Sequence, residues 1–343
     1  MKVGVVGLGR MGEGMSRRIQ SAGIEVVGYR RNYDKSLEAK ASGYITEAAK
    51  TIKDLVQQLR TDDEPSIYLM VVPAENVEAT ITELIDAGAG KGDIIIDHGN
   101  SNFKDSRRRA LHLEYRGITY LDCGTSGGVY GLKRGYCLMV GGEAEAVDYC
   151  SPIFSALAPG IDAAPRTLPG SDVTPAENGW LHCGSAGAGH LVKCIHNGIE
   201  YGQMAALAEG LNILRRANLG TTYVSEGDAE VAPMDNPMDY CYDLDIPEIV
   251  EVWRRGSVVS SWLLDLTAES MRQDNELDAF AGGVSDSGEG RWTVKAAVDL
   301  GVPAPTITAS LFSRFESRRL GNYANRVLNA MRAMFGGHAV RKD

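Results

Sequence analysis

The chain has 343 residues, of which 44% are hydrophobic and 23% are charged, and its formal net charge at pH 7 is -10. This length exceeds what one hydrophobic core usually serves, so it predicts two domains of an ordinary globular protein. The negative charge argues against a nucleic-acid partner, and no apolar run is long enough to suggest a membrane partner.

The 6 cysteines are scattered along the chain, without a Cys-x-x-Cys pair or a Cys/His spacing that would suit a metal. This distribution is typical of reduced thiols in a cytosolic protein. No signal-peptide pattern precedes Met1-Lys2-Val3. We therefore expect a cytoplasmic protein without a bound metal.

The first predicted element is a short β-branched strand, Val3 to Val6, which leads into Gly7-Leu8-Gly9-Arg10-Met11-Gly12. A helical pattern and a second strand, Glu25 to Tyr29, follow. Strand, G-x-G-x-x-G and helix in this order are typical of a dinucleotide-binding unit. Gly7 makes the tight turn, Gly9 lets the pyrophosphate approach, and Gly12 lets helix and strand pack. We expect the pyrophosphate at the N-terminus of the helix.

The end of the second predicted strand bears on the choice of cofactor. An Asp or Glu at this point would bind the ribose 2′-hydroxyl of NAD, but the chain has Arg30-Arg31-Asn32. Two guanidinium groups suit a 2′-phosphate, which arginine binds through charge-assisted hydrogen bonds. The sequence therefore predicts NADP, with NAD left open. The alternative is that one or both arginines only face solvent.

Strands and helices continue to alternate up to residue 185, which predicts an α/β domain of the Rossmann type over residues 1–185. The further predicted strands are Ser66 to Pro73, Asp93 to Asp97, Ile118 to Cys123, Tyr136 to Gly141 and Gly179 to Gly184. Predicted helices cover Val77 to Ile85 and Ala144 to Leu157.

Ligands of such sheets bind beyond the carboxyl ends of the strands. The sequence places Val72, Asn100-Ser101 and Ser126-Gly127-Gly128 at such ends. We expect Val72 and Asn100 to contact the cofactor, and the exposed amides to receive a nicotinamide or a substrate carboxylate. The alternative is that these short segments are plain turns.

Residues 186–343 show helical periodicity and few strand signals, which predicts an all-α second domain. The predicted helices are 189–217, 247–256, 257–271, 292–300, 305–319 and 323–335, with an acidic, irregular connection over 221–245.

The stretch from Gly187 to Tyr201 is the most informative. Four polar residues recur at i, i+3, i+4 and i+7 and share one face of the predicted helix: Lys193, His196, Asn197 and Glu200. Apolar residues on the other side are expected to be buried: Leu191, Val192, Ile195 and Ile199. Lysine, histidine and a carboxylate on one face form an acid–base set. The alternative is a solvated face with ordinary charge pairs.

In these motifs the chain resembles the decarboxylating 6-phosphogluconate dehydrogenase family, in its short-chain bacterial form. The matching segments follow in order and spacing over nearly the whole chain: Gly7 to Gly12, Gly99-Asn100-Ser101, Ser126-Gly127-Gly128, Lys193 with His196 to Tyr201, Gly290 to Thr293, and Arg332 to His338. The resemblance implies that the chain converts 6-phospho-D-gluconate to D-ribulose 5-phosphate and carbon dioxide, a step of the pentose phosphate pathway. It also implies that residues 186–343 bind substrate and form a homodimer or homotetramer.

The resemblance implies a role for each matching residue. Lys193 is the base at the C3 hydroxyl, and Glu200 is the acid that protonates C1 of the enediol. The residues implied to orient the substrate beside them are Asn100, Ser126, Gly127, Gly128, His196 and Asn197. The residues implied to hold the phosphate are Tyr201 and Arg314 of the same subunit and Arg332 of the partner subunit, with His338 of the partner subunit nearby.

Two departures from the family pattern concern the ligands. Longer members read Lys-Gly-Thr-Gly-Lys-Trp where this chain reads Ser287-Gly288-Glu289-Gly290-Arg291-Trp292. A phosphate-binding lysine is therefore missing at Ser287, Glu289 is poorly suited to a phosphate, and Arg291 is the residue that would compensate. Short-chain relatives often carry Asp at the end of the second strand and use NAD, whereas this chain carries Arg30-Arg31.

Two other functions use parts of the same pattern. A β-hydroxyacid dehydrogenase of the 3-hydroxyisobutyrate type would share the glycine motif, the Ser-Gly-Gly turn and the base lysine. It would need neither Glu200 as an acid nor the tail with Arg332 and His338. A non-catalytic NADP-binding sensor would not require Lys193 and Glu200 together.

Overall fold

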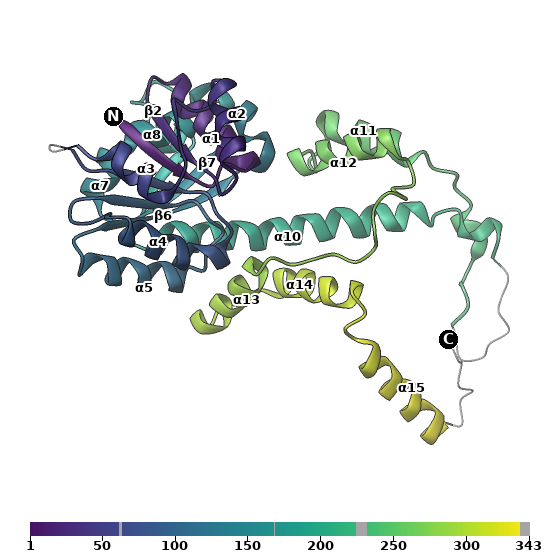
Figure 1. Ribbon diagram of the computed structural model, residues 1–343. Helices are drawn as coiled ribbons and strands as arrows, with labels where there is room; N and C mark the ends of the chain where they lie inside the picture. Colours follow the sequence, from purple (N-terminus) through teal and green to yellow (C-terminus); the bar gives the residue numbers. More distant parts are fainter. Residues whose placement is uncertain (62–63, 168, 224–231, 337–343) are drawn as a thin grey trace. The chain divides into compact units, whose positions relative to one another are not determined.

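A computed structural model of the chain describes residues 1–61, 64–167, 169–223 and 232–336. The chain divides into two compact units, Met1–His196 and Asn197–Asp343. The division falls within one long helix, α10 (Ala188–Arg215), which Figure 1 shows as a continuous rod. The domain boundary that the sequence suggests, between residues 185 and 186, stays a prediction.

The first unit is built on an eight-stranded sheet with the order β3-β2-β1-β4-β5-β6-β7-β8. Strands β1 to β6 pair in parallel, β7 runs antiparallel to β6, and β8 is parallel to β7. The strands are β1 (Lys2–Val6), β2 (Glu25–Tyr29), β3 (Glu47–Ala49), β4 (Ile67–Met70), β5 (Ile94–Asp97), β6 (Thr119–Ser126), β7 (Cys137–Gly141) and β8 (Trp180–Gly184). This sheet confirms the α/β fold of the Rossmann type.

Helices pack on both faces of this sheet (Figure 1). Parallel strands that are covered on both faces need apolar side chains on both. Ile94 and Ile96 lie in one buried cluster and Ile95 in the other. The helices of this unit are α1 (Arg10–Ser21), α2 (Tyr33–Ala41), α3 (Ile52–Leu59), α4 (Val77–Asp86), α5 (Phe103–Glu114), α6 (Gly131–Arg134), α7 (Ala144–Tyr149), α8 (Ser151–Leu157) and α9 (Pro175–Asn178).

The direction of the chain across the sheet reverses between β1 and β4. From β1 the chain moves outward to β2 and β3, and from β4 it moves the other way to β5 and β6. A crevice opens beyond the carboxyl ends of the strands at such a point, and ligands of open α/β sheets bind there. The loops that follow β1, β4, β5 and β6 are therefore the positions at which this fold presents functional residues.

Every regular element that the structure describes beyond α10 in the second unit is helical, which confirms the all-α prediction. The helices are α11 (Ile246–Gly256), α12 (Trp262–Gln273), α13 (Glu289–Leu300), α14 (Pro305–Ser317) and α15 (Asn322–Gly336), with short 3-10 turns at Leu219–Thr221 and Pro237–Tyr240. The helix expected from residue 257 begins at Trp262 instead. The Ser261 hydroxyl accepts a hydrogen bond from the Leu264 N–H and caps it there.

The buried stripe that the sequence suggests for the start of α10 is partly wrong. Val192 is 42% exposed and Ile199 is 52% exposed, whereas Cys194, Asn197 and Tyr201 are buried. Glycine explains the shift, because it lets a helix backbone approach its neighbours closely. A Cβ at Gly198, for example, would lie only 2.6 Å from Cγ2 of Thr293. The small and polar side of α10 is thus the packed one.

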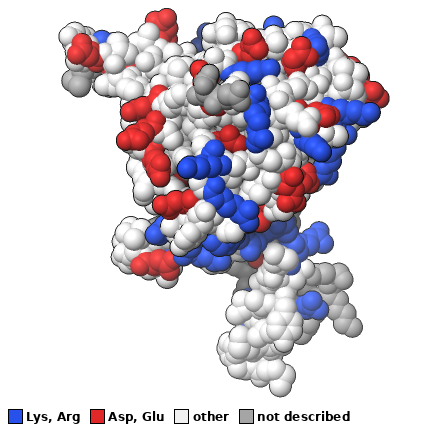
Figure 2. Space-filling view, turned by 60° about the vertical axis from the view of Figure 1, so that its left-hand side comes forward, with Lys and Arg blue, Asp and Glu red and all other residues white. Residues whose placement is uncertain are grey.

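The surface carries both signs of charge. Figure 2 shows Lys and Arg side chains gathering in places on the visible face, despite the net charge of -10. An anionic ligand is therefore compatible with an acidic chain. None of the described helices is both long and apolar enough to cross a membrane.

Candidate active site

The glycine motif forms a tight loop between β1 and α1. Gly7 has a φ of +105°, which favours glycine, and its N–H donates to the Tyr29 carbonyl at 3.0 Å. A Cβ at Gly12 would overlap the Gly7 carbonyl oxygen, so the helix lies directly on the turn. A Cβ at Gly9 would meet nothing within 4 Å. The loop thus leaves open space at Gly9, beside the N-terminus of α1, which suits a cofactor pyrophosphate.

The segment after β2 lies beside this loop. Nη1 of Arg30 lies 3.4 Å from Oε1 of Glu13 on α1, and both side chains are about one-third exposed. Arg31 is exposed. Asn32 caps α2, because its Oδ1 accepts a hydrogen bond from the Lys35 N–H at 3.3 Å. Arg30 and Arg31 follow directly after β2, the position that bears on the ribose 2′-substituent in this fold, and their contact with a cofactor stays a prediction. The side chain of Asn32 is bound to its own helix.

Val72 follows β4 and lies next to the glycine loop. A Cβ added to Gly7 would lie 3.1 Å from Cγ1 of Val72. The sequence predicts that Val72 contacts the cofactor, and the structure places it beside the glycine loop. Its contact with a cofactor stays a prediction.

The loop after β5 is held by the buried carboxylate of Asp97. This carboxylate accepts hydrogen bonds from the Gly99 N–H at 2.8 Å, the Ser101 hydroxyl at 2.9 Å and the Tyr120 hydroxyl at 2.8 Å. Asn100 lies between the two anchored loop residues and is exposed. The structure therefore fixes the loop on both sides of Asn100 and presents that residue at the carboxyl end of β5.

His98 is buried in the same loop. Its Nδ1 lies 3.0 Å from the Thr125 hydroxyl at the end of β6. Burial lowers the pKa of His98 to about 4, so its imidazole is neutral at pH 7. This contact joins the end of β5 to the Ser126-Gly127-Gly128 turn. Gly127 and Gly128 have φ values of +128° and +51°, which explains why glycine occupies both positions.

Lys193 lies against β6. A Cβ at Gly124 would overlap Cβ of Lys193, so no larger residue fits between the strand and the helix. The side chains of Lys193, His196 and Glu200 are partly exposed, at helical spacing along α10. The helix therefore presents the predicted acid–base residues without burying them in a core.

In the second unit, Asn197 and Tyr201 of α10 lie beside α13 and α14. Nδ2 of Asn197 donates to Oε1 of Glu289 at 3.1 Å, and the Arg314 guanidinium lies 3.5 Å above the centre of the Tyr201 ring. Burial, and then the negative charge of Glu289, raise the pKa of Tyr201. Three of the predicted substrate residues are thus brought together: Asn197, Tyr201 and Arg314.

Arg291 is bound to a carboxylate. It makes two hydrogen bonds to the carboxylate of Asp286, at 2.6 and 3.2 Å. Arg318 binds the same carboxylate at 2.9 Å, and these guanidinium groups lower the pKa of Asp286. Arg332 lies on α15 and is exposed. His338 lies outside the described residues.

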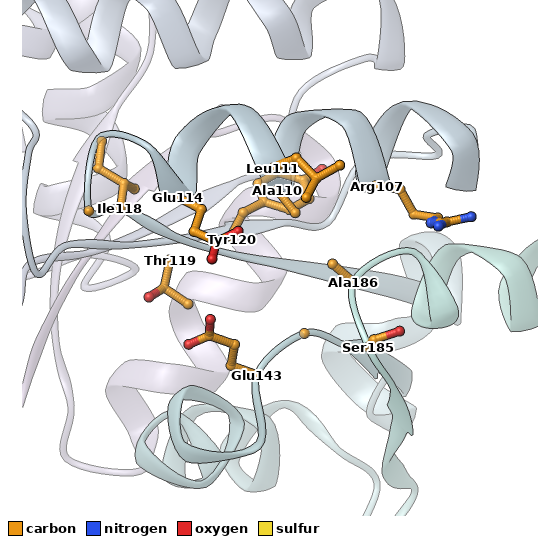
Figure 3. A pocket seen from close by; sticks show the side chains of 12 residues that line it. Arg107, Ala110, Leu111, Glu114, Ile118, Thr119, Tyr120, Glu143, Ser185 and Ala186 are labelled. Atoms are coloured by element: carbon orange, nitrogen blue, oxygen red, sulfur yellow. The ribbon is translucent and has the colours of Figure 1, made fainter.

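Two pockets lie away from these residues. One of about 460 Å³ is lined by α5, the start of β6 and the Ser185-Ala186 turn (Figure 3). It contains Arg107 but also Glu114 and Glu143. Another of about 830 Å³ lies in the second unit and is lined by α10, α11 and α12. Neither pocket includes a residue that the sequence predicts to bind cofactor or substrate.

Three carboxylates near these sites were not predicted: Asp97, Asp122 and Glu289. Asp97 and Asp122 each follow apolar residues of a buried strand and have no exposed surface. Such a residue needs hydrogen-bond donors, and this is the signal that marks it in a sequence. Among the described residues, no group of three or more His, Cys, Asp or Glu side chains is placed to hold a metal ion.

Comparison with known families covers both units. The NAD-binding domain of 6-phosphogluconate dehydrogenase matches residues 2–164. The C-terminal domain of 6-phosphogluconate dehydrogenase matches residues 189–226 and 243–325.

Individual relatives agree with this assignment. The NAD⁺-dependent, decarboxylating 6-phosphogluconate dehydrogenase of Haloferax volcanii is 38% identical over 347 residues, which cover 100% of both chains. The 6-phosphogluconate dehydrogenase of Plasmodium falciparum, solved with its cofactor NADP⁺ and with its substrate 6-phosphogluconate, is 26% identical. Its TM-score is 0.72, over 96% of this chain and 65% of that chain.

The rival family shares the fold. A 3-hydroxyisobutyrate dehydrogenase of Salmonella typhimurium is 20% identical, with a TM-score of 0.65 over 94% of this chain and 95% of that chain. Such a likeness concerns the fold alone. The full-length relative and the two matched domains decide the family. As the motifs predict, the chain belongs to the 6-phosphogluconate dehydrogenase family.

Proposed function

We propose that the protein catalyses the oxidative decarboxylation of 6-phospho-D-gluconate to D-ribulose 5-phosphate and carbon dioxide, with NADP as the preferred cofactor. The observation that carries the proposal is helix α10, which places Lys193, His196, Asn197 and Glu200 at i, i+3, i+4 and i+7. Membership of the 6-phosphogluconate dehydrogenase family supports the substrate and the reaction.

Lys193 acts as the base in the first step. NADP, when bound, would supply the acceptor for the hydride from C3 of the substrate. Lys193 takes the proton of the C3 hydroxyl, which requires a neutral amine, and a closed site of low polarity favours that form. The product of this step is a 3-keto acid, in which the carboxylate lies β to the ketone.

Decarboxylation then breaks the bond between C1 and C2, and its electron pair forms an enediol. Lys193, now protonated, donates its proton to the C3 oxygen and so stabilises the charge that develops there. Glu200 gives a proton to the carbon that becomes C1 of ribulose 5-phosphate, while Lys193 takes back the proton of the neighbouring enediol oxygen, so that the ketone forms. For this step Glu200 must be protonated.

The remaining predicted residues bind and orient. In this proposal Asn100, Ser126, Gly127, Gly128, His196 and Asn197 contact the hydroxyls and the carboxylate of the sugar acid. Its phosphate is contacted by Tyr201, Arg314 and Arg291 of the same subunit and by Arg332 of the partner subunit. His338 of the partner subunit lies nearby. The active form is a cytoplasmic homodimer or homotetramer, because the tail of one subunit completes the site of another.

The preference for NADP rests on the end of β2. Arg30 and Arg31 are cationic where an NAD-specific fold carries a carboxylate. The known relatives include an NAD⁺-dependent enzyme and one with NADP⁺ as its cofactor. Arg30-Arg31 is what favours NADP in this chain.

The test is to incubate the purified protein with 6-phosphogluconate and either NADP or NAD, and to measure reduced nicotinamide and released carbon dioxide together. The proposal predicts equal amounts of both, with the higher kcat/KM for NADP. Reduction without carbon dioxide, or turnover only of unphosphorylated β-hydroxy acids, would support the 3-hydroxyisobutyrate type instead. Turnover with NAD alone would keep the reaction and overturn the cofactor preference.

A variant at Glu200 separates the proposed reaction from its rivals. Glu200→Gln keeps the size of the side chain but removes the acid. It should slow formation of ribulose 5-phosphate by about 100-fold or more, as expected for loss of a general acid. A simple dehydrogenase or a cofactor sensor would be nearly indifferent to the same change.

A further inference from the structure

Asp122 on β6 binds the first turn of α10. Its Oδ1 accepts a hydrogen bond from the Gly187 N–H at 2.6 Å, and its Oδ2 accepts one from the His190 N–H at 2.7 Å. The side chain of Asp122 has no exposed surface. Both oxygens of one buried carboxylate are therefore used on the start of one helix.

The two hydrogen bonds from the start of α10 to Asp122 are strong because a helix N-terminus favours a negative charge. The first N–H groups of a helix have no partner within the helix, and the aligned peptide dipoles make that end positive. α10 has 28 residues, so the helix dipole is fully developed at its N-terminus. A carboxylate that meets these N–H groups forms charge-assisted hydrogen bonds. Without them a buried carboxylate would be strongly unfavourable.

Close packing fixes the position of α10 along β6 and β7. A Cβ at Gly189 would overlap the carbonyl oxygen of Met139 and lie 2.5 Å from that of Asp122. The helix backbone therefore touches the backbone of two strands. His190 adds a lateral contact, since its Nδ1 lies 2.7 Å from the Ser106 hydroxyl on α5.

The side chain of Lys193 starts at the same contact between α10 and β6. Residues two apart on a strand point to the same side, so Asp122 and Gly124 face α10 together. Asp122 holds the first turn, and Gly124 meets Cβ of Lys193 about one turn later. The position of the Lys193 side chain is thus set by the strand that holds the start of its helix.

We propose that Asp122 is a positioning residue, which fixes the register of α10 on β6 and so places Lys193 for proton transfer. This inference rests on the proposed function in one respect, namely that Lys193 is the base. A shift of the base by about 1 Å lowers a rate by about 100-fold, so a residue that sets its position has a kinetic signature.

The chain offers a matched control for the test. Asp93 is also a nearly buried carboxylate that accepts two backbone N–H groups, from Ser66 at 3.2 Å and Gly90 at 2.9 Å. It precedes β5 and so lies at the opposite end of the strands from the predicted active-site loops. In each case the change to Asn keeps the shape but replaces one acceptor oxygen with a donor.

Both variants, Asp122→Asn and Asp93→Asn, should lower the melting temperature. Only Asp122→Asn should lower kcat, by about 100-fold, with the Kd for NADP unchanged within about twofold. Asp93→Asn should keep the kcat of the wild type. Equal effects of the two variants on kcat, or a wild-type kcat in Asp122→Asn, would overturn the proposal.

A second variant covers the case in which Asp122→Asn does not fold. Gly124→Ala keeps the carboxylate of Asp122 but places a methyl group against Cβ of Lys193 and 2.8 Å from the Gly189 carbonyl oxygen, and so displaces the helix from the strand. It should cause a comparable loss of kcat. A wild-type kcat in this variant would contradict the proposal.

Hydrogen exchange of the full chain separates this proposal from the proposed reaction. Amides of the Gly187–Lys193 segment should exchange faster in Asp122→Asn than in Asp93→Asn, whatever the substrate. If the wild type does not oxidise 6-phosphogluconate, the proposed function fails while this measurement still decides the role of Asp122. Unchanged exchange would refute the anchoring itself.

Discussion

Asn197 and Glu289 are 92 residues apart in the sequence and are joined by a hydrogen bond of 3.1 Å between buried side chains. The Ser287 hydroxyl lies 3.4 Å from the same carboxylate oxygen, Oε1 of Glu289. Since Nδ2 of Asn197 donates to a carboxylate, which only accepts, the orientation of the amide is fixed. Glu289 thus contacts a predicted substrate residue, although it does not suit a phosphate.

The contact between Glu289 and Asn197 leads to a first prediction. Glu289→Ala should raise the KM for 6-phosphogluconate by about tenfold, because a hydrogen bond to a charged group that orients Asn197 is lost. Glu289→Gln should have a smaller effect, since its carbonyl oxygen still accepts from Asn197. Steady-state kinetics measure both, with the KM for NADP as the internal control. Equal effects of the two variants would show that the charge matters and not the acceptor.

The two arginines near Tyr201 should differ in function. Arg314 donates to the Ser285 carbonyl at 2.7 Å and stacks on the Tyr201 ring, and both of these partners are neutral. Arg291 is bound by two hydrogen bonds to Asp286. Because a phosphate would have to compete with that carboxylate, we expect Arg314 to contribute more to substrate binding.

Arg314→Ala should therefore raise the KM for 6-phosphogluconate by about tenfold or more, the usual effect of losing a charge-assisted hydrogen bond. Arg291→Ala should have a smaller effect on this KM and should also lower the melting temperature, because Asp286 loses one of the two guanidinium groups that bind it in the described part of the chain. Kinetics and thermal unfolding of the two variants measure this difference. A larger KM effect for Arg291→Ala would instead favour the phosphate role that the sequence suggests for it.

Long and regularly patterned elements could be predicted from the sequence, but contacts between distant residues could not. The apolar run at Ile94–Ile96 and the glycine motif carry their own signals. Strand β3 has only the residues Glu47, Ala48 and Ala49, and its pairing with β2 makes it a strand. Such tertiary pairing overrides local propensity.

The site shows the same division. Lys193 and Glu200 stand in one local motif, so their shared face followed from helical spacing. The hydrogen bond that the Gly187 N–H donates to Asp122 spans 65 residues, and no sequence periodicity connects the two residues. The antiparallel direction of β7 was also not predicted. It follows from the short connection between Ser126 and Cys137, which pair with each other.

The arginines after β2 provide a prediction on cofactor choice. The double variant Arg30→Ala with Arg31→Ala should raise the KM for NADP by about tenfold to 100-fold and leave the KM for NAD nearly unchanged, because only NADP carries the 2′-phosphate. Arg17→Ala is a suitable control, since Arg17 lies on α1 but over the Tyr44 ring, at 5.4 Å. Parallel increases for both cofactors would mean that the arginines do not distinguish them.

Buried His98 should make the stability of the protein depend on pH. Burial lowers its pKa to about 4, whereas an unfolded histidine titrates near about 6.5. Between these values the unfolded state binds the extra proton, so stability falls as the pH falls from about 6.5 towards about 4, by about 3 kcal/mol in all. His98→Asn removes this proton site and should flatten the decline, which melting temperatures across that pH range measure. The exposed His112 on α5 is the control, because His112→Gln should leave the decline unchanged. Parallel pH curves for the wild type and His98→Asn would contradict the prediction.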